Sequence, residues 1–386
     1  MNFNLLAKLR EISSKKSNRP KREIFAPGRV NIIGEHLDYN GGSVLPFSID
    51  KGVYSIISKS EDFELFALDL REKFEFKNCE EFDLNKSSWL NYVLGVYLLL
   101  KKDHPKIQGF HLSFGSDLPS GAGLSSSAAL CNSMVYGLNM IYELNLSKLE
   151  MAKVSQSAEQ LYAGVNCGIM DPYASLFGKK DNAIHLNCQS LESEYIPMIL
   201  PGHKWILFNT GKTHQLNDSP YNNRKEICQR ALRKINQNGY QIENLCQSDL
   251  KNIGSFREFL NENEFRKSSY VIQENARVQL AISALKSQDL ETLGTLLFES
   301  HDGLRKSYEV SSAELDFLVD LGKIQNGVKG ARLVGAGFGG CVLTLVDTDL
   351  EKQITEKFKE EFYSKFNRQL NIYYPSSGKG VHEIVN

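Results

Sequence analysis

The pattern of apolar and polar residues along the 386-residue chain predicts a mixture of strands and helices. Residues 53–60 and 63–70 alternate between apolar and polar side chains, as half-buried strands do. Residues 87–102 instead place their apolar side chains at helical spacing. A strand predicted at 109–119 runs into a loop of small residues, and a helix predicted over 127–144 follows it. The small residues therefore lie at a strand–loop–helix junction.

Shorter elements are predicted before the middle of the chain. Residues 147–164 are typical of a helix that ends in glycine. The segment 171–178 is typical of a short helix with Asp171 as its capping residue, Pro172 in its first turn and Gly178 at its end.

The remaining pattern predicts strands at 183–188 and 204–211 and long charged helices from about residue 218 onward. Near the end, residues 330–347 place a glycine loop between two strands.

The length and the charge of the chain narrow its function. At roughly 100–200 residues per domain, the length predicts two domains, 1–200 and 201–386, with a cleft between them for a site. The 45 basic and 46 acidic residues leave a net charge of −1, which gives no general attraction to nucleic acid or to an anionic membrane. We interpret the basic cluster at 15–22 as a solvated linker. A small molecule is therefore the expected partner.

Cysteines and apolar runs bear on the cell compartment. The seven cysteines are scattered and form no C-x-x-C pair, which argues against zinc sites and thioredoxin-like motifs and fits a reducing compartment. The longest apolar run, 92–100, has about half of the roughly 18 residues needed to span a bilayer. The first residues are typical of a short amphipathic helix rather than of a signal peptide. We therefore expect a cytoplasmic protein.

The loop "LPSGAGLSSSAAL", residues 118–130, has two interpretations. Its glycines would let the backbone approach a ligand closely, and the first N–H groups of the helix that follows would attract a phosphate. Alternatively, serine is simply a good helix cap and glycine a good turn residue. The loop alone does not decide between them.

Two other glycine motifs fail as nucleotide signatures. In "TGKT", 210–213, the first glycine of a P-loop would have to be residue 206, which is Ile206. "GAGFGG", 335–340, is followed by a strand where a dinucleotide-binding unit needs a helix, so NAD binding is disfavoured. The second motif can be a tight hairpin or the lining of a ligand site.

Polar residues gather in the loop "GRVNIIGEHLDYNGG", residues 28–42. Arg29, Glu35, His36 and Asp38 lie within ten positions there, and such groups recognise the hydroxyls of a sugar. Asp171 is a different case. Its stretch alone favours a helix cap, although a carboxylate at a helix N-terminus would also suit a group that accepts a hydrogen bond from a substrate hydroxyl.

Taken together, these segments resemble the galactokinase family. The loop at 28–42 resembles the family signature, 118–130 resembles its phosphate-binding loop, and "GVNCGIMDPYASLFG" and "GAGFGGCV" resemble two further family segments. The likeness runs from about Phe25 to Cys341, within a superfamily that also contains homoserine, mevalonate and phosphomevalonate kinases.

The resemblance implies a fold and a reaction. The fold would be of the α+β class, a two-domain small-molecule kinase fold with mixed or antiparallel sheets. It would have an N-terminal ribosomal-protein-S5-like domain, a C-terminal ferredoxin-like domain and the active site in the cleft. The reaction would be the ATP-dependent phosphorylation of the anomeric hydroxyl of galactose, with Mg²⁺ as the metal, by a protein that we expect to be a monomer.

The resemblance also implies residue roles. Asp171 would be the catalytic aspartate, with Arg29 beside it. Ser127 and Glu159 would hold Mg²⁺, with Ser126 as an alternative to Ser127. The remaining implied contacts are, for the sugar, Glu35, His36, Asp38, Gly168 and Tyr221, and, for ATP, Trp89, Gly121, Gly123, Leu124, Ser125, Ser126 and Ser127, with Gly337 and Gly339 lining the site from the second domain.

Two residues depart from the family pattern, and two other functions stay open. Leu37 stands where the family usually has Thr, which puts the preferred sugar in doubt, and Pro172 stands where it usually has Gln, which could shift the helix of Asp171. The alternatives are a kinase for a related sugar, such as N-acetylgalactosamine or arabinose, and a galactose-sensing regulator without catalysis. The complete serine loop argues against the regulator.

Overall fold

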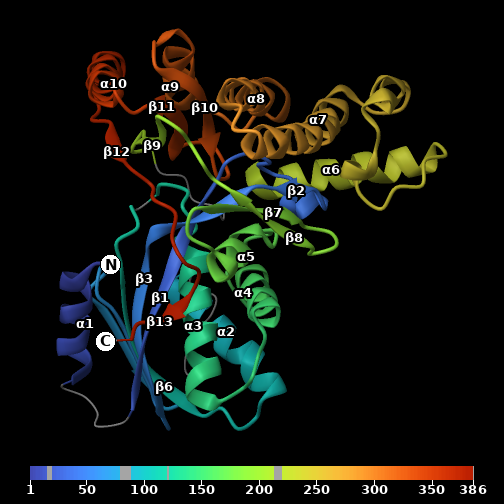
Figure 1. Ribbon diagram of the computed structural model, residues 1–386. Helices are drawn as coiled ribbons and strands as arrows, with labels where there is room; N and C mark the ends of the chain where they lie inside the picture. Colours follow the sequence, from blue (N-terminus) through green and yellow to red (C-terminus); the bar gives the residue numbers. More distant parts are fainter. Residues whose placement is uncertain (15–19, 79–87, 120, 213–219, 386) are drawn as a thin grey trace.

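The computed structural model describes residues 1–14, 20–78, 88–119, 121–212 and 220–385, and for Pro220 and Tyr221 it describes only the backbone. The described helices and strands form a lower and an upper domain, joined by a small sheet between them (Figure 1). Helices and mixed or antiparallel sheets in two domains agree with the predicted fold class.

A six-stranded sheet organises the lower domain. All neighbouring strands are antiparallel except the parallel pair β4–β6. Because residues alternate between the two faces of a strand, Tyr54 and Ile56 pack against the first helix, whereas Ile57 packs on the opposite side. In order across the sheet, the strands are β13 (His382–Glu383), β1 (Lys21–Asn31), β3 (Pro46–Ser60), β6 (Gly109–Ser116), β4 (Phe63–Ala67) and β5 (Glu72–Phe76).

Helices cover both faces of this sheet. The first helix, α1 (Phe3–Ser14), lies on one face and buries Leu5, Leu6 and Leu9, as its amphipathic pattern predicts. The other face carries α2 (Trp89–Asp103), α3 (Ser126–Tyr142), α4 (Lys148–Tyr162) and α5 (Met170–Phe177) (Figure 1).

The upper domain contains an antiparallel sheet of four strands in the order β10 (Val328–Val334), β11 (Cys341–Asp347), β9 (His203–Asn209) and β12 (Asn371–Tyr373). A small sheet, β2 (Ser43–Val44), β7 (Asn182–Asn187) and β8 (Ser193–Pro197), lies between the domains. The upper helices are α6 (Pro220–Gln237), α7 (Glu262–Lys286), α8 (Leu290–Gly303), α9 (Ala313–Ile324) and α10 (Glu351–Phe366), with α6 and α7 extending to one side (Figure 1).

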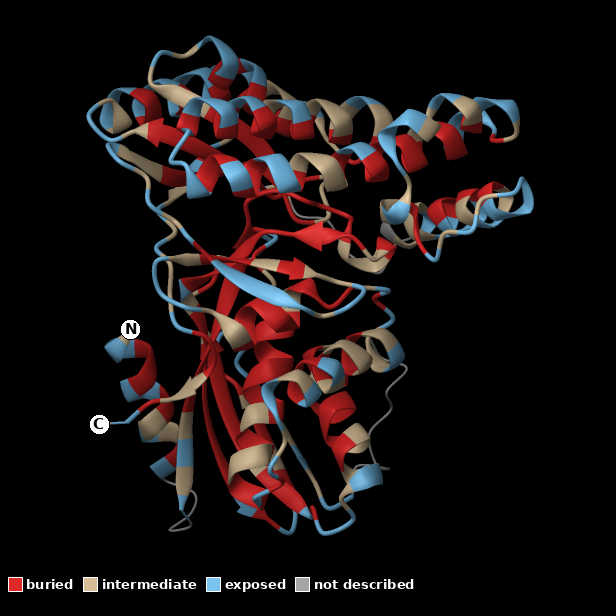
Figure 2. Ribbon diagram, turned by 45° about the vertical axis from the view of Figure 1, so that its right-hand side comes forward, coloured by how far each residue is buried: buried red, intermediate tan, exposed pale blue. Residues whose placement is uncertain are grey.

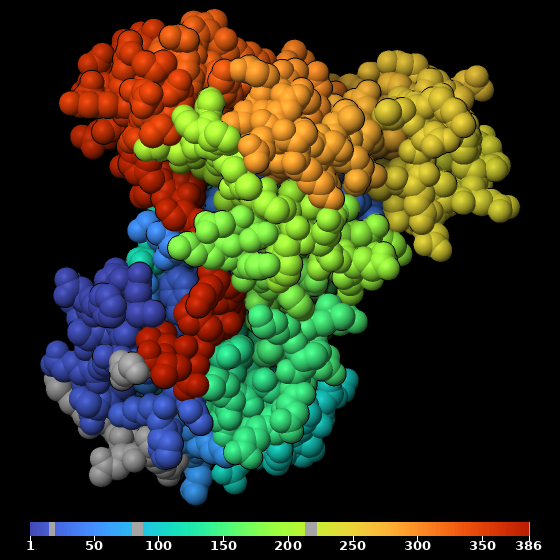
Figure 3. Space-filling view, in the orientation of Figure 1, coloured from blue at the N-terminus to red at the C-terminus, as the bar shows by residue number. Residues whose placement is uncertain are grey.

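The end of the chain returns to the lower domain. After β12, residues 374–385 cross back, and β13 pairs with β1 through Ile24 and Phe25 (Figure 1). Figure 3 shows these last residues, in red, lying on the surface between the blue N-terminal residues and the green ones. The expected boundary near residue 200 falls between β8 and β9, but the last strand lies with the first half of the chain.

Most buried apolar side chains form one large cluster that includes residues of both domains, and a smaller cluster lies under α1. Figure 2 shows buried segments, in red, in both domains. In the part of the chain that the structure describes, no helix has both the length and the apolar character that crossing a membrane requires.

One predicted helix start is wrong. The short helix begins at Met170, and the backbone position that caps it is Ile169 rather than Asp171. The Asp171 side chain instead accepts hydrogen bonds from another strand and from the serine loop, so tertiary contacts override the local capping preference. Gly178 ends the helix as predicted.

Candidate active site

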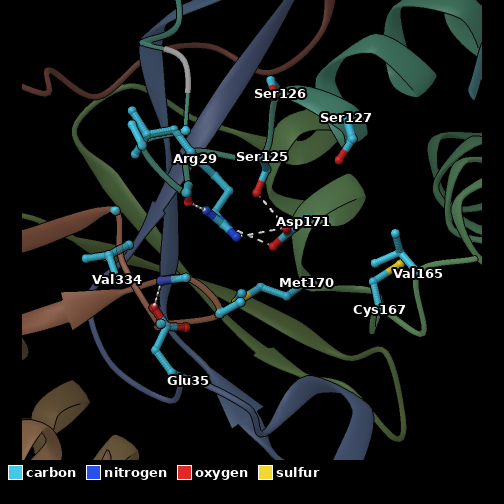
Figure 4. A pocket seen from close by; sticks show the side chains of 18 of the residues that line it. Arg29, Glu35, Ser125, Ser126, Ser127, Val165, Cys167, Met170, Asp171 and Val334 are labelled. Atoms are coloured by element: carbon cyan, nitrogen blue, oxygen red, sulfur yellow. Dashed lines mark hydrogen bonds and ion pairs between the residues drawn. The ribbon is translucent and has the colours of Figure 1, made fainter. Parts of the chain in front are cut away.

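A cavity open to solvent lies where the two domains meet, and its empty space, open solvent included, is about 1140 Å³. Its walls come from the loop after β1, the loop before α3, the segment before α5 and the turn between β10 and β11 (Figure 4). The cavity therefore brings together candidate site residues that lie far apart in the sequence.

Arg29 and Asp171 form an ion pair at the centre of this cavity (Figure 4). The guanidinium donates from Nε to Oδ1 at 2.7 Å and from Nη2 to Oδ2 at 2.8 Å, a two-point contact that fixes both side chains. Arg29 is buried, and the Asp171 side chain is 24% exposed. The pair can thus present a fixed, charged carboxylate to a ligand.

The serine loop is attached to this ion pair. Arg29 Nη1 donates to the carbonyl of Gly123 at 2.5 Å, and Ser125 Oγ donates to Asp171 Oδ2 at 2.5 Å. Gly121, Gly123 and Ser125 all have positive φ, between 60° and 70°. Glycine adopts this left-handed conformation without strain, which explains the two glycines of the loop.

The helix α3 begins directly after this loop, at Ser126. The first N–H groups of a helix have no partner inside the helix. Ser125 stands at the capping position of α3, and its side chain makes no capping hydrogen bond to these groups. Ser126 and Ser127 both line the cavity from this first turn (Figure 4). The arrangement is that of an anion site at a helix N-terminus.

Glu159 and Ser127 are neighbours on the same side of the cavity. The Glu159 carboxyl is buried, and burial raises its pKa to about 7, while a hydrogen bond from Ser127 opposes the shift. A divalent cation would hold this carboxylate ionised. One carboxylate and one hydroxyl beside a phosphate site are ligands that Mg²⁺ accepts, so these residues fit the implied metal.

The polar loop at 28–42, named the sugar loop after the family signature that it resembles, contributes Glu35, His36 and Asp38 to the lining of the cavity. His36 Nδ1 lies 2.7 Å from the hydroxyl of Tyr39, and burial, with Arg224 close by, lowers the pKa of the imidazole to about 3. His36 is therefore neutral. Burial also raises the pKa of Asp38 to about 7, helped by the nearby negative charges of Asp171 and Glu35.

Three implied contacts are not among the described residues that line the cavity. Gly168 lies against Asp38 so closely that a Cβ would clash with its carboxylate, which explains the glycine. Tyr221 is at the start of α6, and its side chain lies outside the described part of the structure. Trp89 packs between Phe74 and Phe114, and its indole N–H donates to Glu72; it does not line the cavity formed by the described residues.

The turn at 335–340 connects β10 and β11, as predicted, and faces the serine loop. A Cβ on Gly335 would lie 3.2 Å from the carbonyl oxygen of Gly123. Gly337 and Gly339 line the cavity, and a Cβ on Gly337 would clash with the carbonyl of Val310. Gly335 therefore lets the two domains approach each other backbone to backbone, whereas Gly337 packs against the backbone of its own domain.

Residues that the sequence did not indicate hold the sugar loop from behind. Tyr270 donates to the Glu35 carbonyl at 3.1 Å, Glu274 accepts from the Gly34 N–H at 3.1 Å, and Asn275 accepts from the Ser43 N–H at 2.9 Å. Of these three residues, only Glu274 could have been found from the sequence, because a carboxylate on the apolar face of a helix requires a partner.

The two departures from the family pattern have local explanations. Leu37 is fully buried in the apolar core, and it is not among the residues that line the cavity. Pro172 stands in the first turn of α5, where a missing N–H removes no helical hydrogen bond. Neither residue therefore disturbs the position of Asp171.

Comparisons with known proteins show the family of the chain. The galactokinase galactose-binding signature matches residues 14–59, and the N-terminal and C-terminal domains of GHMP kinases match 91–179 and 281–364. The galactokinase of Thermotoga neapolitana is 40% identical over 361 residues, covering 94% of this chain and 99% of that protein. That of Fusobacterium nucleatum is 35% identical, covering 99% of each.

The fold agrees as well. The crystal structure of Lactococcus lactis galactokinase complexed with galactose superposes with a TM-score of 0.94 at 31% identity, covering 99% of this chain and 100% of that one. Mevalonate kinase of Methanococcus jannaschii, at 20% identity and a TM-score of 0.67, shares the fold. With near-complete coverage by relatives of one name and the galactose-binding signature in place, the chain belongs to the galactokinase family.

Proposed function

We propose that the protein is a galactokinase, which transfers the terminal phosphoryl group of ATP to the C1 hydroxyl of galactose. One observation carries the proposal: the Arg29–Asp171 pair lies in the cavity that the sugar loop and the serine loop both line, and it contacts the serine loop directly. A carboxylate so placed can accept the proton of a hydroxyl while the phosphate approaches from the other side.

The chain's own residues would perform three tasks. The first N–H groups of α3 and the glycine backbones would hold the phosphates, because phosphoryl transfer depends mainly on positioning and charge neutralisation. Asp171 would orient the C1 hydroxyl and take its proton, with Arg29 fixing the carboxylate. Glu35, the neutral His36 and Asp38 would bind the other hydroxyls of the sugar.

Glu159 and Ser127 would hold Mg²⁺. When bound, the metal supplies positive charge that offsets the charge developing on the phosphates. A reducing, cytoplasmic location belongs to the same proposal and is supported by the cysteines, since the six that the structure describes are free thiols.

The experiment is ADP release with Mg·ATP against galactose, glucose, N-acetylgalactosamine, arabinose and galacturonate. We expect turnover with galactose to dominate. Turnover confined to another sugar would overturn the substrate but keep the kinase reaction. Binding of both galactose and ATP without turnover would support the regulator instead.

A further inference from the structure

Arg332 is a fully buried arginine on β10 that reaches across the domain interface. Its Nη1 donates to the carbonyls of Asn31 and Ile32, both at 3.1 Å, where β1 ends and the sugar loop begins. Its Nη2 lies 3.3 Å from Glu35 Oε1. One side chain of the upper domain thus contacts both the backbone and the carboxylate of the sugar-binding segment.

The Glu35 carboxylate is held on both oxygens. Oε1 accepts from the N–H of Gly335 at 2.8 Å, and Oε2 accepts from Asn31 Nδ2 at 2.7 Å. Glu35 is only 1% exposed. Two of its three partners, Arg332 and Gly335, therefore belong to the upper domain, and Gly335 opens the glycine turn that lines the cavity.

The number of acceptor positions is limited. A carboxylate offers about four lone-pair positions, and the donors at Gly335 and Asn31 occupy one on each oxygen. Arg332 Nη2 adds a charge contact with Oε1 at 3.3 Å without a hydrogen bond. Oε2 therefore keeps a lone pair for a substrate hydroxyl, and its direction depends on how these three partners hold the group.

We propose that Arg332 is a positioning residue for sugar binding, which acts by orienting the Glu35 carboxylate across the domain interface; this rests on the function proposed above. Arginine suits the task because its planar fork reaches two carbonyls and a carboxylate at once. Lysine, a single flexible point charge, cannot reproduce that geometry.

The first test is Arg332→Lys, which keeps the charge. We expect the KM for galactose to rise about tenfold with kcat nearly unchanged, because ground-state sugar binding is what weakens. The matched control is Arg230→Lys, another arginine beside a buried carboxylate, Glu264, on the projecting α6. It should leave both constants unchanged.

The second test is a double-mutant cycle that separates positioning from simple loss of structure. If Arg332 acts through Glu35, the Arg332→Met/Glu35→Gln variant should have the same galactose KM as Glu35→Gln alone. That variant also removes both buried charges together, so it is expected to fold even where Arg332→Met does not.

Two results would overturn the inference: a folded Arg332→Lys protein with the wild-type KM for galactose, or additive effects in the cycle. Failure of the proposed function is distinguishable, since wild-type protein would then not phosphorylate galactose at all. Circular dichroism and thermal melting of each variant establish that the compared proteins are folded.

Discussion

Three residues other than glycine adopt left-handed backbone conformations within the loops that line the cavity: His36, Ser125 and Phe338, with φ of 64°, 60° and 61°. Such conformations cost free energy for a residue with a Cβ, so the surrounding structure must hold them. Each lies in one of the three loops that the cavity brings together. Other non-glycine residues with positive φ lie elsewhere in the described chain, but these three are the ones whose loops line the cavity.

Asp171 gives the most direct prediction at this scale. Asp171→Asn keeps the size of the side chain but removes its ability to take a proton, so we expect kcat to fall about 10²–10⁴-fold. The measurement is ADP release at saturating galactose and ATP. Asp349→Asn, at an exposed position in the upper domain, serves as the control. Activity of Asp171→Asn near that of the wild type would contradict the role of base.

Glu159 gives a prediction about pH. In the metal-free folded protein its pKa is about 7, above the value of 4.5 for an unfolded glutamate. Between those values the folded state keeps a proton that the unfolded state has released, so stability from this group falls as pH rises from about 4.5 to 7. Glu159→Gln removes this loss. We expect the free energy of unfolding of the variant, relative to that of the wild type, to rise by about 2 kcal/mol as the pH goes from 5 to 8.

The measurement is urea unfolding at both pH values with a chelator present. Only the difference between variant and wild type is informative, because His36, with a pKa lowered to about 3, contributes a slope of opposite sign below pH 6.5. Glu356→Gln, at an exposed position on α10, should show no such gain. An equal effect in both variants would show that burial of Glu159 is not the cause.

Leu37 tests whether the departure from the family pattern affects the sugar. The residue is fully buried, so Leu37→Thr removes apolar contacts and buries a hydroxyl, which should cost about 2–4 kcal/mol of folding free energy. Leu37→Ile, of equal volume, should cost less than about 1.5 kcal/mol. The ranking of sugars in the turnover panel should stay the same in both. A changed ranking would show that Leu37 does reach the substrate.

At the scale of elements, the pattern of apolar residues predicted correctly those strands and helices whose buried faces are visible in their own sequence. The strands at 53–60 and 204–211 and the helix at 87–102 lie within β3, β9 and α2 or overlap their ends. The start of α5 was misplaced because Arg29, more than 140 positions away, takes the carboxylate that would otherwise cap the helix. A contact of that range has no local signal in a single sequence.

The strand β13 could not be predicted for a similar reason. It has two residues, and its existence depends on the free edge of β1. On the way to β13, the chain supports α5: the Gly380 N–H donates to the Gly178 carbonyl at 2.8 Å, and the Val381 N–H donates to that of Ser175 at 2.9 Å. The last residues therefore brace the helix that carries Asp171.

Gly380 allows this support to be tested. A Cβ at this position would clash with the carbonyl of Leu176, so Gly380→Ala should push the returning chain away from α5. We expect a loss of about 1–3 kcal/mol in stability and a lower kcat. Gly254→Ala is the matched control, because nothing lies within 4 Å of its Cβ and its φ is not positive. Wild-type kcat in Gly380→Ala would show that α5 holds its place without the brace.

At the scale of the whole molecule, composition and spacing indicated the loops of the site but not the contacts between them. The sugar loop, the serine loop and the glycine turn are each continuous in sequence, so their composition was visible. The pairing of Arg29 with Asp171 was implied by the family resemblance alone, and that of Glu35 with Gly335 was not expected, because both contacts join distant segments. Arg332 was hidden within an apolar strand.

The same contacts across the interface predict how the molecule unfolds. The apolar cluster includes residues of both domains, and β13 ties the end of the chain to β1. Although chains of this length often unfold in several steps, we expect a single calorimetric transition. Galactose with a non-hydrolysable ATP analogue should raise the temperature of the whole transition. Each ligand should add about 2.7 kcal/mol to the free energy of unfolding when it is present at one hundred times its Kd.

Two separate transitions, with the ligands raising only one of them, would contradict this prediction, because domains that unfold independently do not share their stabilisation. Gly380→Ala provides an internal comparison, since it weakens a tie between the domains without touching the cavity. In that variant the ratio of van't Hoff to calorimetric enthalpy should fall below the wild-type value. In Gly254→Ala the ratio should stay unchanged. If the enthalpy ratio falls in Gly380→Ala but not in Gly254→Ala, the single transition depends on the C-terminal residues that return to the lower domain.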